Sequence, residues 1–249
     1  MTTTEREGHL ARPAFYALRT GGWRDLITLL HPPYTAWHLS YVVFGAVAAP
    51  GLLHGDRLAA ALGAFFLAVG ISAHALDELN GRPLQTQLGR GVLVALGVLG
   101  LAGAAVIGVL GCVIVSPLLA PLIVAGVLLV PAYNLELFGG RLHSDHWFAL
   151  AWGAFPAFTG YFVQTLTVRP AGILVAVACY LLSLAQRRLS TPVRRLRRQT
   201  VSVSGEQRLA DGSVVELDRA SLAQPLEGAL SALWLALVLL AVGLLLTRL

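Results

Sequence analysis

A histidine and two carboxylates lie close together in the stretch SAHALDELNGRPLQT, residues 72–86. His74, Asp77 and Glu78 occupy positions i, i+3 and i+4, so in a helix they share one face. Such side chains can converge on one metal ion or one ligand. The preceding residues are strongly apolar, and an acid at the centre of a membrane helix costs on the order of 2.5 to 3.5 kcal/mol. We therefore interpret these three residues as a candidate site, with helix capping at the membrane surface as the alternative.

A second polar stretch, YNLELFGGRLHSDHW, occupies residues 133–147 between two apolar segments. Its candidate site residues are Tyr133, Asn134, Glu136, Arg141, His143, Asp145 and His146. Gly139 and Gly140 indicate a turn, so Asp145 lies near the start of the next helix, as either a cap or a ligand. We interpret His143 and His146 as loop residues, and His38 as a hydrogen-bonded core histidine.

The elements that position these residues are membrane helices. The chain is 56% hydrophobic and 12% charged, with mean hydropathy +0.72, outside the range of ordinary soluble domains. A bilayer core of about 30 Å requires about 20 apolar residues per helix. The sequence predicts an all-α, polytopic membrane bundle of about seven transmembrane helices. The spans fall near residues 34–53, 58–78, 91–115, 117–131, 147–165, 171–184 and 226–246.

The arginines predict the orientation of this bundle. A cytoplasmic N-terminus places most of them inside, and only Arg57, Arg169 and Arg248 outside. Because positive residues favour cytoplasmic loops, the N-terminus is expected inside and the C-terminus outside. The same rule explains the net charge of +5 without a nucleic-acid partner. Both polar stretches then open on the cytoplasmic side, so we predict that they form one site.

Residues 187–224 differ from the apolar segments around them. Arginines crowd positions 187–198 and predict a basic cytoplasmic loop, attracted to anionic lipid by about 1 kcal/mol per residue. Alternating residues around Asp211 and Gly212 predict a small β-hairpin. The predicted division is an interfacial segment at 1–30 with an amphipathic helix over 15–30, a six-helix core at 31–186, the loop and hairpin at 187–224, and a last transmembrane helix at 225–249.

The order of these motifs resembles the UbiA-type prenyltransferase superfamily. In that family the second helix closes on an aspartate-rich motif that precedes an arginine-proline-leucine signature, matched here by Asp77 and by residues 82–84. The stretch 133–164 is also similar, with a tyrosine after the fourth helix and a glycine-rich fifth helix. The resemblance spans about residues 32–184 and implies a helical membrane fold around a lipid-lined cavity.

The resemblance also implies an activity. It implies a transferase that binds an isoprenyl diphosphate through carboxylate-held Mg²⁺ and ionises it for attack by an acceptor. The implied catalytic residues are Asp77, Glu78 and Glu136. The implied metal ligands are His74, Asp77, Glu78 and Asp145. The implied substrate-binding residues are Arg82, Tyr133, Asn134, Arg141 and Asn80, with the arginines clamping phosphate.

Two departures from the family pattern keep other hypotheses open. Histidine in the first motif favours Mn²⁺, Zn²⁺ or Fe²⁺ over Mg²⁺, which indicates another metal-dependent membrane enzyme using His74, Asp77, Glu78 and Glu136. The sixth helix ends in SLAQRRLSTPVRRLRR, where the family carries a second acidic motif. A non-catalytic membrane protein that binds lipid or a protein partner is therefore the third hypothesis.

Overall fold

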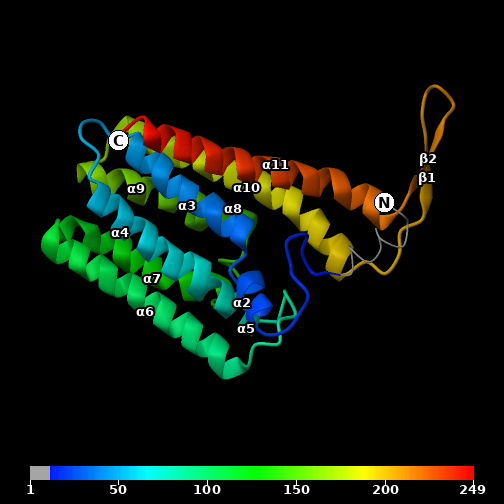
Figure 1. Cartoon of the computed structure of the whole chain (residues 1–249), viewed down its shortest axis with the longest axis horizontal. Coiled ribbons are helices and arrows are strands. Elements are labelled where there is room, and N and C mark those ends of the chain that lie inside the picture. The colour runs from blue at the N-terminus through cyan, green and yellow to red at the C-terminus, as the bar shows by residue number, and fades with distance from the viewer. Residues whose placement is uncertain (1–11) are drawn as a thin grey trace.

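The computed structural model describes residues 12–249, which form a helical bundle with one small β-hairpin at its end (Figure 1). In chain order the elements are α2 (Trp23–Leu29), α3 (Pro32–Val47), α4 (Gly55–Phe65), η1 (Phe66–Ala73), α5 (His74–Leu79), α6 (Arg90–Ile114), η2 (Pro117–Leu119), α7 (Ala120–Asn134), α8 (Asp145–Ala149), η3 (Leu150–Ala154), α9 (Phe155–Thr165), α10 (Pro170–Arg198), β1 (Gly205–Arg208), β2 (Val214–Leu217) and α11 (Arg219–Leu246).

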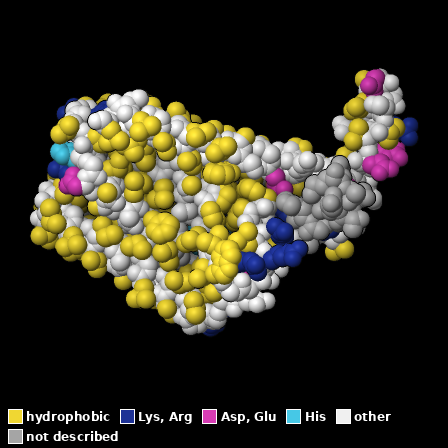
Figure 2. All heavy atoms as spheres, viewed as in Figure 1, with side chains coloured by type: hydrophobic (Ala, Val, Ile, Leu, Met, Phe, Trp, Pro, Cys, Tyr) yellow, Lys and Arg dark blue, Asp and Glu magenta, His cyan; other side chains and the backbone are white. Residues whose placement is uncertain are grey.

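Long apolar helices form the outside of the bundle. Within residues 12–249, five helices have the length and apolar composition to cross a membrane: Gly55–Leu79, Arg90–Ile114, Pro117–Asn134, Pro170–Arg198 and Arg219–Leu246. Apolar side chains cover much of the face seen in Figure 2, and charged side chains gather at its two ends and on the hairpin. This distribution is that of an integral membrane protein, because a bilayer core accepts apolar surface and excludes charge.

The other two expected spans occupy the interior. The segments near 34–53 and 147–165 become α3 and the continuous unit α8–η3–α9, neither of which is among the five long apolar helices. In Figure 1, α3 and α9 run between α11 on one side and α4 on the other. They supply about half of the large buried core, including Trp37, Tyr41 and Trp152. Their backbones approach closely, because a methyl group at Gly45 or Gly160 would overlap a carbonyl oxygen of the facing helix.

Two helical units contain π-helical turns. The segment η1 precedes α5, and η3 separates α8 from α9. A π-turn shifts the register of the following side chains and can free a backbone carbonyl. The carbonyl of Trp152 in η3 accepts a hydrogen bond from the buried His38 Nδ1 at 2.7 Å. Both π-turns therefore lie where polar side chains enter the bundle.

The basic stretch differs from its prediction. Residues 187–198 form no loop; they continue α10 to Arg198. Helix α11 starts at Arg219, earlier than the predicted 226, with Asp218 and Ser221 forming a capping box. The hairpin prediction is confirmed, since β1 and β2 pair antiparallel around the turn at Asp211 and Gly212. Of the expected amphipathic helix over 15–30, only α2 is helical.

The close approach of α3 and α9 yields a stability prediction. We expect Gly160→Ala to lower the free energy of unfolding by about 1 to 3 kcal/mol, because the added methyl group forces the two backbones apart. Gly243→Ala in α11 is the matched control, since no atom lies within 4 Å of its added methyl group. Its higher helix propensity should leave stability equal or raised by about 0.5 to 1 kcal/mol. Thermal unfolding in detergent micelles measures both, and equal effects would contradict this packing.

Candidate functional site

A polar cavity of about 560 Å³ lies where α3, α5, α7 and α10 meet. Its walls include the residue just before α3, the segment 13–16, the loop after α7 and one face of the arginine-rich end of α10. The chemically active side chains among its lining residues are Tyr16, His31, Tyr34, His38, His74, Asp77, Asn80, Tyr133, Asn134, Glu136, His143, Gln186, Arg187, Arg194, Arg195, Arg197 and Arg198.

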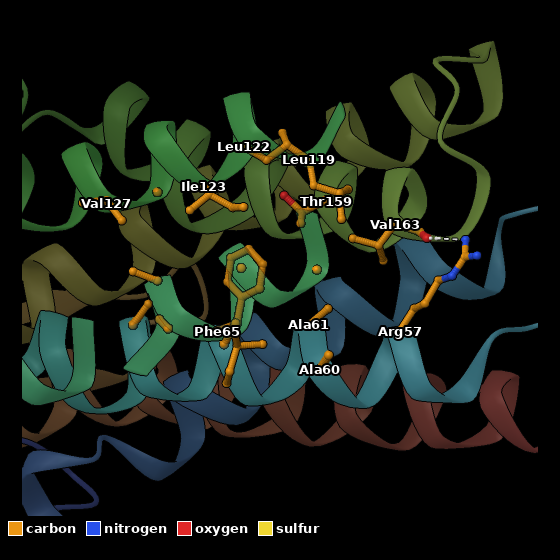
Figure 3. Close-up of a pocket in the computed structure, with 18 of the residues that line it drawn as sticks. Arg57, Ala60, Ala61, Phe65, Leu119, Leu122, Ile123, Val127, Thr159 and Val163 are labelled. Carbon is orange, nitrogen blue, oxygen red and sulfur yellow. Dashed lines mark hydrogen bonds between the residues drawn. The ribbon is translucent and has the colours of Figure 1, made fainter. Parts of the chain in front are cut away.

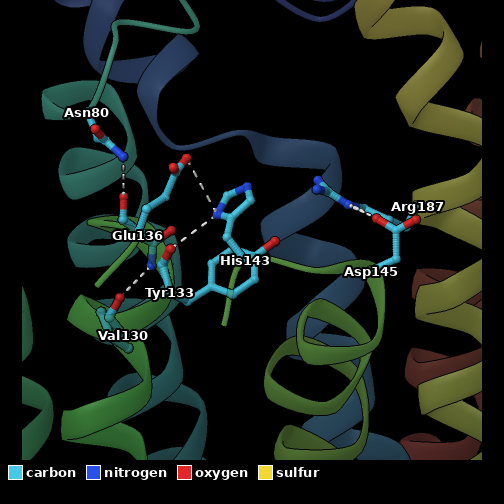
Figure 4. Close-up of polar contacts among 8 residues, drawn as sticks. Asn80, Val130, Tyr133, Glu136, His143, Asp145 and Arg187 are labelled. Atoms are coloured by element: carbon cyan, nitrogen blue, oxygen red, sulfur yellow. Dashed lines mark hydrogen bonds and ion pairs between the residues drawn. The ribbon is translucent and has the colours of Figure 1, made fainter. Parts of the chain in front are cut away.

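The two polar stretches meet at this cavity. Asp77 and Glu136 both line it, which confirms the prediction that the stretches share one pocket. Asn80 at the end of α5 donates a hydrogen bond to the backbone carbonyl of Asn134 at 3.2 Å and joins the two stretches directly (Figure 4). The Asn134 amide is buried and donates to the Val130 carbonyl, so Asn134 secures the end of α7.

Two histidines at the cavity, His38 and His74, each direct ring atom Nδ1 at a backbone carbonyl oxygen. His74 Nδ1 lies 3.1 Å from the Gly70 carbonyl oxygen, and His38 Nδ1 has the Trp152 carbonyl as its partner. A carbonyl oxygen only accepts, so Nδ1 carries the proton and the neutral ring keeps a lone pair on Nε2. The prediction that His38 is a hydrogen-bonded core residue is confirmed, and it also lines the cavity.

His31 adds a third imidazole that the sequence did not single out. Its ring stacks on His74 with centroids 4.1 Å apart, and its Nδ1 lies 2.6 Å from the Tyr16 hydroxyl. The backbone at His31 is left-handed, with φ of 46°, and turns the chain into α3. Burial lowers the pKa of His31 well below its ordinary 6.5, and the nearby His74 and the arginines of α10 lower it further. His31 is therefore neutral at physiological pH.

The rings of His143 and Tyr133 form a stacked pair beside Glu136. The His143 ring stacks on Tyr133 with centroids 4.5 Å apart, and its Nδ1 lies 3.1 Å from the Tyr133 carbonyl oxygen and 3.9 Å from a Glu136 carboxylate oxygen (Figure 4). His143 lies in the loop before α8, as predicted, where it is half-buried and lines the cavity. His146 instead contacts the Tyr180 hydroxyl, on an exposed surface.

Glu78 does not join this site, contrary to the prediction. Its buried carboxylate accepts hydrogen bonds from the backbone of Leu84 and from the backbone and hydroxyl of Thr86, at 2.8 to 2.9 Å. Consecutive helical residues lie about 100° apart around the axis, so Asp77 faces the cavity while Glu78 faces the loop after α5. Glu78 therefore has a structural role, holding the loop that carries the arginine-proline-leucine signature.

Asp145 is also engaged elsewhere. Ser144 is the residue whose side chain caps α8, and Asp145 occupies the first turn. Its carboxylate lies 2.7 Å from Arg187 Nε (Figure 4), and the Arg187 guanidinium lies over the Phe148 ring. The two interpretations offered by the sequence, a cap or a metal ligand, are both replaced by an ion pair that anchors α8 to α10.

The predicted phosphate clamps are likewise in the wrong place. Arg82 donates to the carbonyls of Thr86 and Leu88, and neither Arg82 nor the exposed Arg141 lines the cavity. Arginines of α10 line it instead. Positions 187, 194 and 198 are seven and eleven residues apart, which places them on one helix face. That spacing was visible in the sequence once the stretch was taken as helix.

The implied metal ligands do not form a set. Within residues 12–249 no group of three or more His, Cys, Asp or Glu side chains is placed to hold a metal ion. Of the four expected ligands, His74 and Asp77 line the cavity, whereas Glu78 and Asp145 have the partners described above. The four implied ligands are therefore not brought together among the described residues, and Asp77 is the one implied carboxylate that lines the cavity.

Two buried polar atoms at the cavity have no hydrogen-bond partner within residues 12–249. These are the Tyr133 hydroxyl and the Gln186 Oε1 atom, and both residues line the cavity. A buried polar group without a partner costs about 1 to 3 kcal/mol, so such atoms mark where a ligand or ordered water binds. The cavity therefore has the features of a binding site for a polar group.

An apolar crevice of about 140 Å³ lies between α4, α6, α7 and α9 (Figure 3). Apolar side chains and glycines line most of it, and Arg57 stands at one end. The Thr159 hydroxyl is buried there without a hydrogen-bond partner among the described residues. Phe65 and Ala68 of the crevice lie within one helical turn of Val69, which lines the polar cavity. The two spaces are therefore neighbours along the same helix.

Comparison of the chain with protein-family models, with curated proteins and with solved structures found no match.

The role of Glu78 yields a second prediction. We expect Glu78→Gln to lower the free energy of unfolding by about 1 to 3 kcal/mol, because the amide cannot accept all three hydrogen bonds of the loop. Asp77→Asn should change stability much less, since Asp77 makes no ion pair within 4 Å among the described residues. The measurement is the thermal unfolding of both variants in EDTA, which removes any bound metal. A stable Glu78→Gln variant would favour the metal-ligand interpretation instead.

His31 yields a prediction about pH. Its folded pKa lies below its unfolded value, so the unfolded chain binds the extra proton, and stability is complete above about pH 6.5 and falls as the pH drops below it. We expect the unfolding temperature to drop between pH 7.5 and 5.5. His31→Asn should reduce that drop, because asparagine tolerates the left-handed backbone and does not titrate. An unchanged pH dependence in the variant would contradict the burial of a neutral His31.

Proposed function

We propose that this protein is a membrane transferase of the UbiA-like prenyltransferase type, which binds an isoprenoid or other lipid diphosphate with its head in the polar cavity. The observation that carries the proposal is the cavity itself, in which Asp77, unprotonated imidazole nitrogens and several arginines face one space at the end of an apolar bundle. A cavity of about 560 Å³ accommodates a diphosphate head together with a small acceptor.

The proposal extends to the lipid tail. A molecule with a charged head and a long apolar chain needs two adjoining environments, and the polar cavity and the apolar crevice share neighbouring turns of α4 and η1. Removing apolar surface from water stabilises binding by about 25 cal/mol per Å². A lipid chain that comes from the bilayer is already out of water, so its binding free energy comes mainly from packing contacts. The crevice therefore selects lipid chains by their shape. The polar head supplies the binding energy and the crevice orients the chain.

The proposed reaction uses groups at the cavity. The allylic carbon–oxygen bond breaks, and its electron pair leaves with the diphosphate, whose charge the α10 arginines stabilise. The ring faces of Tyr133 and Tyr34, and the Asp77 carboxylate, stabilise the positive carbon that remains. The acceptor then forms the new bond and loses its proton to an unprotonated imidazole nitrogen at the cavity, a role that we assign to His74 Nε2 because His74 Nδ1 is engaged with the Gly70 carbonyl.

The proposal also includes the number and orientation of the membrane spans. Seven spans arise if α3 and the unit α8–η3–α9 also cross the bilayer as interior helices, and the cavity then opens at the cytoplasmic face. The arginines support this orientation, because those of α10 and of the loop after α5 lie around the cavity end, whereas Arg57, Arg169 and Arg248 belong to connections at the opposite end.

Asp77→Asn tests the proposed activity. We expect the variant to remain folded but to lose at least about 100-fold in turnover of an isoprenyl diphosphate, because a charge beside the developing cation is removed. The measurement is release of inorganic diphosphate by protein in micelles, with a panel of aromatic and lipid acceptors. Asp56→Asn is the matched control, as an exposed carboxylate in the first turn of α4 at the other end of the same continuous helix.

The outcomes separate the hypotheses. Full turnover in Asp77→Asn would end the catalytic assignment. Tight binding of the lipid diphosphate by the unmodified protein with no turnover of any acceptor would instead support a non-catalytic lipid-binding protein, in keeping with the arginines that replace the second acidic motif.

A further inference from the structure

We infer that the diphosphate head is held directly by arginines of α10, without a bridging divalent metal. This inference rests on the proposed function and specifies how the cavity binds its ligand. It departs from what the family resemblance implies, where carboxylates bind metal and the metal binds phosphate. The argument depends on which carboxylates are available, on which arginines face the cavity and on what balances their charge.

Two of the three carboxylates implied as metal ligands have other partners. Glu78 is buried against the loop after α5, and Asp145 is paired with Arg187. Asp77 and Glu136 are the acids among the cavity-lining residues, and Glu136 is exposed beside His143. Mg²⁺ is usually held by one or two carboxylates together with water and substrate phosphates. Asp77 is the half-buried acid left at the cavity among the described residues, so few protein oxygens remain for a metal.

Five of the six arginines of α10 line the cavity, and Arg188, which is exposed, does not. Arg187, Arg194 and Arg198 are half-buried, Arg197 is buried and paired with Glu227, and Arg195 is exposed. If the stretch served only to mark the cytoplasmic side, the arginines would need no common inward face. The inward arrangement indicates that these guanidinium groups bind something inside the cavity.

Two of the inward arginines make no close ion pair among the described residues, although the Asp77 carboxylate shares their cavity. Arg187 is paired with Asp145, but neither Arg194 nor Arg198 has a carboxylate oxygen within 4.0 Å among the described residues. Arg194 donates to the Thr191 hydroxyl, and Arg198 Nε donates to the Pro13 carbonyl, both neutral acceptors. Half-buried cations that share one cavity repel each other and lose solvation, so an anion with at least two charges would stabilise both.

A phosphate or diphosphate group matches this arrangement. Each guanidinium presents a planar fork of donors suited to two phosphate oxygens, and one dianion can bridge two such forks. The unpartnered Tyr133 hydroxyl supplies a further donor at the same cavity. These groups together neutralise the negative charge of the diphosphate. In the family pattern, metal ions held by the second acidic motif would supply that positive charge.

The test measures binding in place of activity. Purified protein in micelles is titrated with geranylgeranyl diphosphate in EDTA and again in millimolar Mg²⁺, and the dissociation constant is read by calorimetry. We expect binding in EDTA, with less than about a threefold difference between the two conditions. Binding that appears only with Mg²⁺ would overturn this inference and leave the proposed function standing, whereas no binding in either condition would defeat the proposed function itself.

Arginine variants identify the groups responsible. Arg194→Gln and Arg198→Gln should each weaken binding in EDTA by at least about tenfold, because each removes one bidentate contact. Arg188→Gln is the matched control on the exposed face of the same helix and should bind as the unmodified protein does. Equal affinity in Arg194→Gln and Arg188→Gln would overturn the inference.

The unfolding temperature, with and without ligand, distinguishes loss of binding from misfolding of the variant. Removing one of two cations that repel each other should leave the unliganded Arg194→Gln protein at least as stable as the unmodified protein, while the rise in unfolding temperature on adding the ligand is lost. A variant less stable without ligand would show a structural role and contradict the inference.

Two simpler ligands separate the contributions of the head group and of the lipid chain. Binding of inorganic diphosphate would show that the head group alone suffices for binding. Binding of geranylgeraniol, which lacks phosphate, with the same affinity as geranylgeranyl diphosphate would exclude phosphate recognition.

Discussion

Polar groups inside a membrane helix bundle must find partners within the protein, because lipid supplies none. In this chain that constraint organises one end of the bundle. Carbonyls at π-turns or helix ends bind His38, His74 and His143, the buried Glu78 carboxylate binds backbone amides, and Asp145 pairs with Arg187. What remains without an internal partner then becomes informative, since it points to the molecule that completes the site.

The neighbours Asp77 and Glu78 show how the constraint divides similar residues. Glu78 finds three donors in the loop after α5 and becomes part of the scaffold. Asp77 faces the cavity and stays available for chemistry. The division has a consequence for the loop as well, because the arginine-proline-leucine signature is held in place by a carboxylate and does not itself reach the cavity.

The interior helices explain how a polar cavity can persist in an apolar bundle. Helices α3 and α9 pack backbone to backbone at Gly45 and Gly160, which places bulky aromatic residues beside this contact and leaves space towards α5 and α7. Surrounding apolar helices shield this interior from lipid. The result is a cavity whose charge is set chiefly by α10, the helix that combines a membrane-spanning half with an arginine-rich half.

The sequence by itself determined the membrane class, the apolar segments, the hairpin at Asp211 and Gly212, and the meeting of the two polar stretches, because hydropathy, turn residues and loop parity are local or additive properties. It did not determine which side chains face the cavity. Glu78, Asp145 and Arg82 were assigned to the site by spacing, yet each had a better partner that only folding brought near. The inward face of α10 was missed because the arginines were taken as loop, whereas tertiary packing extends the helix through Arg198 and turns one face towards the cavity. The direction of a side chain depends on its neighbours in space, and those neighbours are distant in the chain.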